Sequence, residues 1–335
     1  MMRYFGKILP VILFLISGLS FAATTKARFG IVTNLETDHI ADRVDELGVT
    51  WVRIGIYWDQ VEPSKGHFDW RGPDAMIDRA TERGLKVFAT IHATPRWASG
   101  HRSAAAPPMH ARDWKDFVSA VAERYKNQTA LRAYGMWNEP DLEKFWTGNQ
   151  KEYMNKILIP GYEAVKAVNS NLLVGGPELS QHWVGSSKWS LKEILNTAGR
   201  YIDIITQHYY PDKNETIDSF LDKSLRPVRA GKKVWITECG MVACSSFKCS
   251  EDKQSHYLLS LLKAQKTRST WVKKIFPYRI WDPVDECDSN GNGFGLTYTE
   301  PIRKRPSFST YKDFIDHLPF TDPAPRCHAT PKNVL

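Results

Sequence analysis

The chain has 335 residues, of which 42% are hydrophobic and 24% are charged, and its net charge is +8 at pH 7. This length suits one large domain or two small ones, and the apolar share is that of a globular protein with a sizeable core. The positive charge is scattered in small clusters with no zinc-finger spacing and no long basic run, so we expect no nucleic-acid partner.

Residues 1–22 are predicted to be a secretory signal peptide. Arg3 and Lys7 give a positive start, residues 9–19 form an apolar stretch, and Ala22 closes a small-x-small cleavage site. The stretch is too short and wrongly flanked for a stable membrane span, although an uncleaved anchor is the alternative. We therefore expect a secreted or periplasmic protein, monomeric and without a membrane span after cleavage.

From residue 28 onward, strand-like runs alternate with amphipathic helical runs. The expected strands are residues 28–34, 49–57, 85–92, 131–137, 172–176, 202–209, 233–238 and 274–281. The expected helices are residues 37–47, 73–83, 112–126, 150–168, 190–198, 216–228, 252–266 and 307–317. Such alternation predicts a parallel sheet with helical crossovers.

Eight strands are the number that closes into a (β/α)8 TIM barrel. We expect one catalytic barrel over residues 23–318, followed by an irregular tail over residues 319–335. A doubly wound open sheet is the alternative, but no glycine-rich phosphate loop supports it.

Polar and aromatic side chains gather where the predicted strands end, and barrel enzymes place their catalytic groups there. These residues are Arg53, Tyr57, Trp58, His92, Asn138, Glu139, His208, Tyr210, Glu238, Arg279 and Trp281. Two glutamates from opposite sides of a barrel are what glycoside hydrolysis needs. One protonates the leaving oxygen, and the other attacks the anomeric carbon or activates water.

Side chains alternate between the two faces of a strand, which predicts how these groups point. Val234, Ile236 and Glu238 are expected to share one face, with Cys239 pointing away. Two further sets are each expected to share a face: residues 51, 53, 55 and 57, and residues 206, 208 and 210.

Asn138 and Glu139 are adjacent and should diverge. Both reach one pocket only if the strand end is bulged or already turning, and we predict that irregularity. The acid has to keep its proton near neutral pH, and the nucleophile has to stay ionised near Arg53 and a tyrosine hydroxyl.

These motifs resemble the two catalytic signatures of clan A glycoside hydrolases. The matching stretches are Asn138-Glu139-Pro140, Trp235-Ile236-Thr237-Glu238, Trp51-Val52-Arg53 with Trp58, Val61-Glu62-Pro63, Gly66, Phe68-Asp69-Trp70, the His-x-Tyr of residues 208–210, and Trp281. The chain most resembles glycoside hydrolase family 39 and its bacterial exopolysaccharide-degrading relatives, and the likeness covers most of the mature chain.

The resemblance implies the central roles. Glu139 would be the acid/base, Glu238 the nucleophile, and Asn138 the group that binds the sugar 2-hydroxyl. Because the clan retains the anomeric configuration, the two carboxyl groups should lie about 5 to 5.5 Å apart. No cofactor and no metal is implied.

The resemblance also implies how the site is lined. Arg53 and Tyr210 would orient the nucleophile, and Trp281 would form the floor of the sugar site. His92 and His208 would be polar wall residues.

Four tryptophans fall in loops that follow strands, namely Trp58, Trp97, Trp146 and Trp183. Aromatic faces stack on sugar rings, so these residues, Trp58 above all, are candidates to line a long substrate groove. Packing in the core or at the rim is the alternative for each of them.

The five cysteines are a departure from the family pattern. An odd number leaves at least one thiol without a partner in the chain, and Cys239 is our candidate. We favour Cys244–Cys249 and Cys287–Cys327 as disulfides, although four cysteines allow three pairings. Residues 288–293 match half of a calcium loop, but position 299 is not acidic, so we expect a loop without metal.

We therefore expect a retaining β-glycosidase that hydrolyses a polysaccharide by double displacement, with internal cleavage of an exopolysaccharide favoured. One alternative is an exo-acting enzyme similar to β-xylosidases or β-glucosidases. Others are a carbohydrate-binding barrel without turnover, and an exported metalloenzyme that uses His92 and His208.

Overall fold

The computed structural model describes residues 27–180, 189–210, 215–243, 250–282, 293–298 and 303–317. Several predictions fall outside these residues: the signal peptide, the C-terminal tail, Trp183, most of the calcium-like loop and both disulfides. Among the described helices, none has the length and apolarity that a bilayer span requires.

Eight parallel strands form one sheet in chain order. They are β1 (Gly30–Val32), β2 (Trp51–Tyr57), β3 (Lys86–His92), β4 (Leu131–Met136), β5 (Leu173–Leu179), β6 (Ile204–Tyr209), β7 (Val234–Cys239) and β8 (Val272–Pro277). Single backbone bridges join Phe29 to Ile275 and Val32 to Tyr278, so the first and last strands meet at a seam. The predicted (β/α)8 barrel is confirmed.

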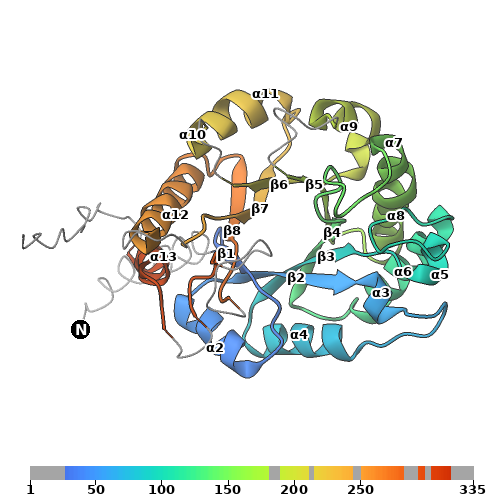
Figure 1. The fold of residues 1–335 in the computed structure, drawn as a ribbon, viewed down its shortest axis with the longest axis horizontal. Helices are drawn as coiled ribbons and strands as arrows, with labels where there is room; N and C mark the ends of the chain where they lie inside the picture. Colours follow the sequence, from blue (N-terminus) through green and yellow to red (C-terminus); the bar gives the residue numbers. More distant parts are fainter. Residues whose placement is uncertain are drawn as a thin grey trace, which may run out of the picture.

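Helices surround the strands as an outer ring (Figure 1). They are α2 (Asp38–Leu47), α3 (Trp58–Val61), α4 (Arg71–Glu82), α5 (Arg96–Ser99), α6 (Ala111–Arg124), α7 (Gln150–Tyr153), α8 (Ile159–Val168), α9 (Leu191–Ala198), α10 (Ile217–Ser219), α11 (Arg226–Val228), α12 (Ser250–Thr267) and α13 (Pro306–Asp316). Two π-helical turns, Met154–Leu158 and Phe220–Leu225, join α7 to α8 and α10 to α11. The short helices α3 and α5 were not predicted.

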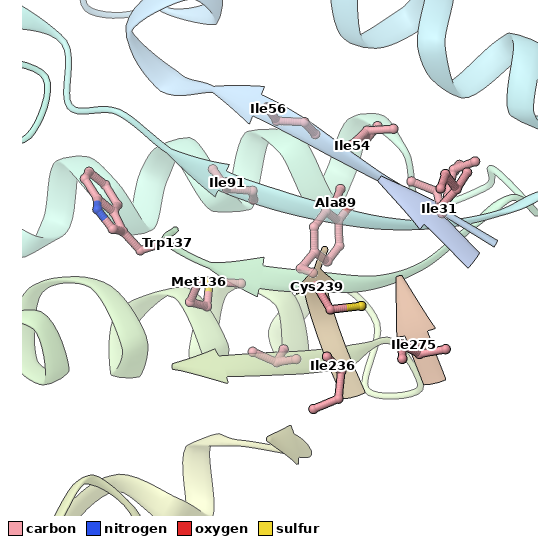
Figure 2. Packing of buried hydrophobic residues seen from close by; sticks show 14 of the residues in the cluster. Ile31, Ile54, Ile56, Ala89, Ile91, Met136, Trp137, Ile236, Cys239 and Ile275 are labelled. Carbon is pink, nitrogen blue, oxygen red and sulfur yellow. The ribbon is translucent and has the colours of Figure 1, made fainter. Parts of the chain in front are cut away.

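Two apolar clusters build the core. The larger one lies between the barrel and its helices, and Figure 2 shows part of it, including Ile54, Ile91 and Ile236. The smaller one lies inside the barrel, before the carboxyl ends of the strands, and consists of Val32, Trp51, Phe88, Ala133, Ile204, Trp235 and Phe276. Since Trp51 lies two residues before Arg53 on the inner face of β2, this packed floor leaves the polar groups at the carboxyl end of the barrel.

Strand β7 corrects one prediction. Val234 and Ile236 belong to the outer cluster and Trp235 to the inner one, so the first two do not share the face of Glu238. The register of β7 shifts against both neighbouring strands between Ile236 and Cys239, and this bulge reverses the alternation. Cys239 points outward into the large cluster as predicted, and its thiol is free and buried (Figure 2).

Candidate active site

Seven polar side chains from five strands meet at the carboxyl end of the barrel. They are Arg53, Asn138, Glu139, Glu178, His208, Tyr210 and Glu238. Six of these were predicted from the sequence, and Glu178 was not.

Glu238 is held by two strong donors. Arg53 Nη1 donates to Oε1 at 2.6 Å, and the Tyr210 hydroxyl donates to Oε2 at 2.6 Å. Burial acts to raise the pKa of Glu238, but the charges of His208 and Arg53 and the Tyr210 hydrogen bond outweigh it and hold that pKa below its ordinary value. Glu238 therefore has the ionised state that a nucleophile needs.

Glu139 lies where the chain has already left β4. Trp137 and Glu139 adopt positive φ angles of 84° and 42°, so the predicted irregularity is present, and the Glu139 side chain turns toward His208. Its Oε1 lies 3.0 Å from His208 Nδ1, and one of its oxygens lies within 4.8 Å of an oxygen of Glu238. This separation matches retaining glycosidases and is shorter than the roughly 6.5–9.5 Å of inverting enzymes.

Arg53 joins three acceptors. Besides Glu238, it donates from Nη2 to Asn138 Oδ1 at 2.8 Å and to Glu178 Oε2 at 2.7 Å. Burial acts to lower the pKa of Arg53, but the charges of Glu178 and Glu238 raise it further above its ordinary range. Because Oδ1 of Asn138 is taken by Arg53, its NH2 group is the end that can donate to a ligand.

Glu178 is the residue that sequence reasoning missed. The fifth strand was expected to end at residue 176, whereas β5 continues to Leu179. Glu178 is 0% exposed and accepts from Arg53 and from the Thr90 hydroxyl. A glutamate inside a run of apolar residues and glycines was the available signal, because a fully buried carboxylate requires partners.

The two predicted wall histidines differ in charge. Burial acts to lower the pKa of His208, but the carboxylates of Glu238, Glu139 and Glu178 outweigh it and raise that pKa to about 9. His92 packs on the Tyr57 ring at 4.6 Å, and burial together with the Arg53 charge lowers its pKa to about 4. At neutral pH, His208 is a cation and His92 a neutral wall residue.

The tryptophan assignments need correction. Trp58 is fully buried among the rings of Trp97, Trp114 and Phe117, and its Nε1 donates to Glu62, so it belongs to the core. A substrate cannot reach it there. Trp146 is buried in the same cluster.

Trp281 also packs against the large core cluster. Tyr278, directly after β8, faces the rings of Tyr210 and Phe294 at 6.5 and 5.9 Å. Among the described residues after β8, Tyr278 is thus an aromatic residue beside the site, three positions before the predicted Trp281.

Glu139, His208 and Glu238 each offer one metal-ligating atom within 4.8 Å of the others. Both oxygens of Glu238 already accept hydrogen bonds, and the Arg53 cation lies 2.6 Å from one of them. We therefore do not assign a metal site to this group. His92 is not part of it, contrary to the metalloenzyme alternative.

Comparison with known proteins places these features in a family. Residues 17–273 match the family model described as Cellulase (glycosyl hydrolase family 5). A β-xylosidase of Caldicellulosiruptor saccharolyticus is 29% identical over 210 residues, which are 56% of this chain and 42% of the relative. A β-xylosidase of Geobacillus stearothermophilus is 25% identical over 212 residues, 56% of this chain and 41% of the relative. The chain thus spans about two fifths of the curated relatives it matches.

Solved structures share the fold. A monomeric β-xylosidase from Caulobacter crescentus CB15 aligns with a TM-score of 0.67 at 19% identity, over 87% of this chain and 68% of that one. Xylanase B from Clostridium stercorarium F9 aligns with a TM-score of 0.66 at 16% identity, over 88% of this chain and 99% of that one. At these identities the likeness shows the barrel fold alone.

Proposed function

The chain belongs to the cellulase family of glycoside hydrolases, glycosyl hydrolase family 5, and from this premise we propose that it is a retaining β-glycosidase that cleaves a β-linked glycan. The membership confirms the clan A resemblance. The observation that carries the proposal is the pair Glu139 and Glu238, which each place a carboxylate oxygen within 4.8 Å of the other.

In the first step of the proposed reaction, the Glu238 carboxylate attacks the anomeric carbon. Glu139, in its acid form, gives its proton to the glycosidic oxygen as the bond from that carbon to the leaving sugar breaks. The product is an ester between the remaining sugar and Glu238. Arg53 and Tyr210 keep one oxygen each of the nucleophile fixed before the attack.

In the second step, Glu139 is a carboxylate and takes a proton from water. The water oxygen attacks the anomeric carbon, and the ester bond to Glu238 breaks, which restores both glutamates. The His208 cation at 3.0 Å stabilises the Glu139 carboxylate during this interval. The Asn138 NH2 group binds the sugar 2-hydroxyl, and Tyr278 supports the sugar ring.

The substrate class is proposed from the chemistry and from the relatives' names. Two of the curated relatives, those described above, are β-xylosidases, which favours β-xylosides among the first compounds to try. The prediction of internal cleavage of an exopolysaccharide loses the support of Trp58 and Trp146, which lie in the core. It stays a prediction, and the length of the products from a panel of digested exopolysaccharides tests it.

Turnover of p-nitrophenyl β-D-xyloside, β-D-glucoside, β-D-galactoside and β-D-mannoside tests the function. We expect activity from the wild type and loss of it in Glu139→Gln and Glu238→Gln. Glu62→Gln is the matched control, because Glu62 is an equally buried glutamate that pairs with Trp58 and Gly66 outside the site. The first-formed product should keep the β configuration by NMR. A binding protein without turnover would show no product from any of the four glycosides.

We also propose export as a monomer, with residues 1–22 removed and two disulfides formed. The mass of the protein recovered from its native host tests the cleavage. Thiol labelling under denaturing conditions tests the disulfides, since one reactive thiol, at Cys239, is expected before reduction. A labelled Cys244 would contradict the pairing.

A further inference from the structure

The proposed mechanism uses two glutamates, yet the site holds a third. Glu178 is 0% exposed, so its side chain is not open to a sugar from solvent. The role inferred for Glu178 rests on the proposed function, because it concerns how the acid/base Glu139 keeps its proton. A buried carboxylate that takes no part in bond making requires another explanation.

The surrounding backbone is adapted to this side chain. Glu178 has a φ of +52°, and β5 shifts its register against β6 between Pro177 and Leu179. A Cβ atom at Gly135 would lie 1.7 Å from Glu178 Oε1, so only glycine leaves room for the carboxylate. The Glu178 N–H is held by the Thr206 hydroxyl at 3.2 Å. These features fix the carboxylate inside the barrel.

The Glu178 carboxylate faces both cations of the site. Its Oε2 accepts from Arg53 Nη2 at 2.7 Å and from Arg53 Nε at 3.2 Å, and it lies 3.6 Å from His208 Nε2. The Thr90 hydroxyl lies 3.1 and 3.2 Å from its two oxygens. With N–H donors on one oxygen and a hydroxyl near both, Glu178 is placed as an ionised acceptor.

The charges of the site balance only when Glu178 is included. In the resting enzyme, Glu238 is ionised and Glu139 must be protonated, so one negative charge would face the two cations Arg53 and His208. The excess positive charge would draw the proton off Glu139. An ionised Glu178 makes two negative charges against two positive ones.

We propose that Glu178 is a positioning residue that acts through Arg53 and His208. Its carboxylate balances the second cation, and this balance lets Glu139 keep the proton that it donates to the leaving sugar. It also fixes the far side of the Arg53 guanidinium, so that Nη1 stays aimed at the nucleophile. His208 then donates from Nδ1 to the carbonyl oxygen of the Glu139 acid, which leaves the other oxygen to carry the proton toward the substrate.

The pH dependence of His208 and Glu139 involves the charged groups that the described residues place around His208. These groups are Glu139 after β4, Glu178 on β5, Glu238 on β7, Arg53 on β2, and the Tyr210 hydroxyl beside Glu238. Removing one negative charge from this set disfavours the protonated forms of its neighbours.

The Glu178→Gln variant tests the proposal. We expect the alkaline limb of the pH profile of kcat/KM for the best aryl glycoside to move to lower pH by about one unit or more. At pH 7 kcat should fall about tenfold or more, with a smaller change in KM, because the loss lies in proton donation rather than in binding. Glu62→Gln removes the same charge from a buried site elsewhere and should leave the profile unmoved. A folded Glu178→Gln protein with the wild-type alkaline limb would overturn the proposal.

A second measurement needs neither substrate nor a folded variant. The ¹⁵N shifts of the His208 ring in the wild type should show both nitrogens protonated at pH 7. A neutral His208 would overturn the charge count. If no glycoside is turned over while His208 is a cation, the proposed function fails and the charge balance stands. If turnover is normal and Glu178→Gln changes neither the profile nor the His208 titration, only this inference fails.

Discussion

Tyr210→Phe removes one of the two hydrogen bonds that keep Glu238 ionised. The lost bond is a 2.6 Å contact from a hydroxyl to a buried carboxylate. A hydrogen bond to a charged group contributes about 1.5–3 kcal/mol. Because this bond stabilises the ionised form, the variant should raise the pKa of Glu238. A loss of this size should move the acidic limb of the activity profile by about one pH unit or more. The lower end is expected, because Arg53 and His208 stay in place.

The assay is the pH dependence of kcat/KM for an aryl glycoside. Glu238 has to be ionised to attack, so a raised pKa moves the acidic limb to higher pH by the same amount while the alkaline limb changes less. Tyr209→Phe is the matched control, because it deletes the same hydroxyl from the next residue, where it donates to the Glu215 carbonyl outside the site.

An acidic limb that stays in place in a folded Tyr210→Phe protein would refute this account of Glu238. It would mean that the Arg53 and His208 charges alone set the ionisation of the nucleophile. Equal movement in Tyr209→Phe would show that the effect arises from packing.

Three further predictions follow from the same structure. Trp58→Ala should lower the free energy of unfolding in urea by about 3–5 kcal/mol, because it empties a core position, and should leave KM unchanged; a raised KM with normal stability would return Trp58 to the substrate site. Gly135→Ala should displace Glu178 and move the alkaline limb of the activity profile to lower pH, and an unmoved limb would show that the pocket relaxes around the added methyl group. Because the pKa of His208 is raised to about 9 from 6.5, its stabilising contribution is full below about pH 6.5 and is lost as the pH rises through 9. Urea midpoints should fall across that window, and His208→Asn should flatten the fall; an equal fall in both proteins would contradict the prediction.

The fold was predictable because its signal is repeated along the whole chain. Each strand with its helix is one repeat of the same pattern, so an error in the boundary of one element does not change the number of strand–helix units. The first strand was expected over residues 28–34, and only Gly30–Val32 pairs as a strand. The (β/α)8 assignment survived such errors.

The catalytic candidates were predictable because short motifs at strand ends carry them. Glu139 and Glu238 each follow an apolar run that predicts a strand. In a parallel barrel all strands end on the same face, and the active site lies there. The irregularity at Glu139 also followed from the sequence, since two neighbouring side chains cannot reach one pocket from a regular strand.

The errors arose where a local change of backbone decides where a side chain points. A bulge in β7 reverses the faces of Val234 and Ile236, and no residue type there announces it. Glu178 depends on another register shift, in β5. Trp58 begins a short helix, α3, and its ring packs against Trp114 of α6. The sequence around Trp58 looks like a loop and does not predict this helix.

The seam between β1 and β8 has a consequence for how the protein matures. The strand that opens the barrel has three residues, and its bridges reach residues made more than two hundred positions later. In a nascent chain, β1 therefore lacks its closing partner until residues 275–278 have been synthesised, and the barrel around the two glutamates closes only after that. Hydrogen exchange should be faster in β1 than in the long central strands, because a short strand held by isolated bridges opens at low cost.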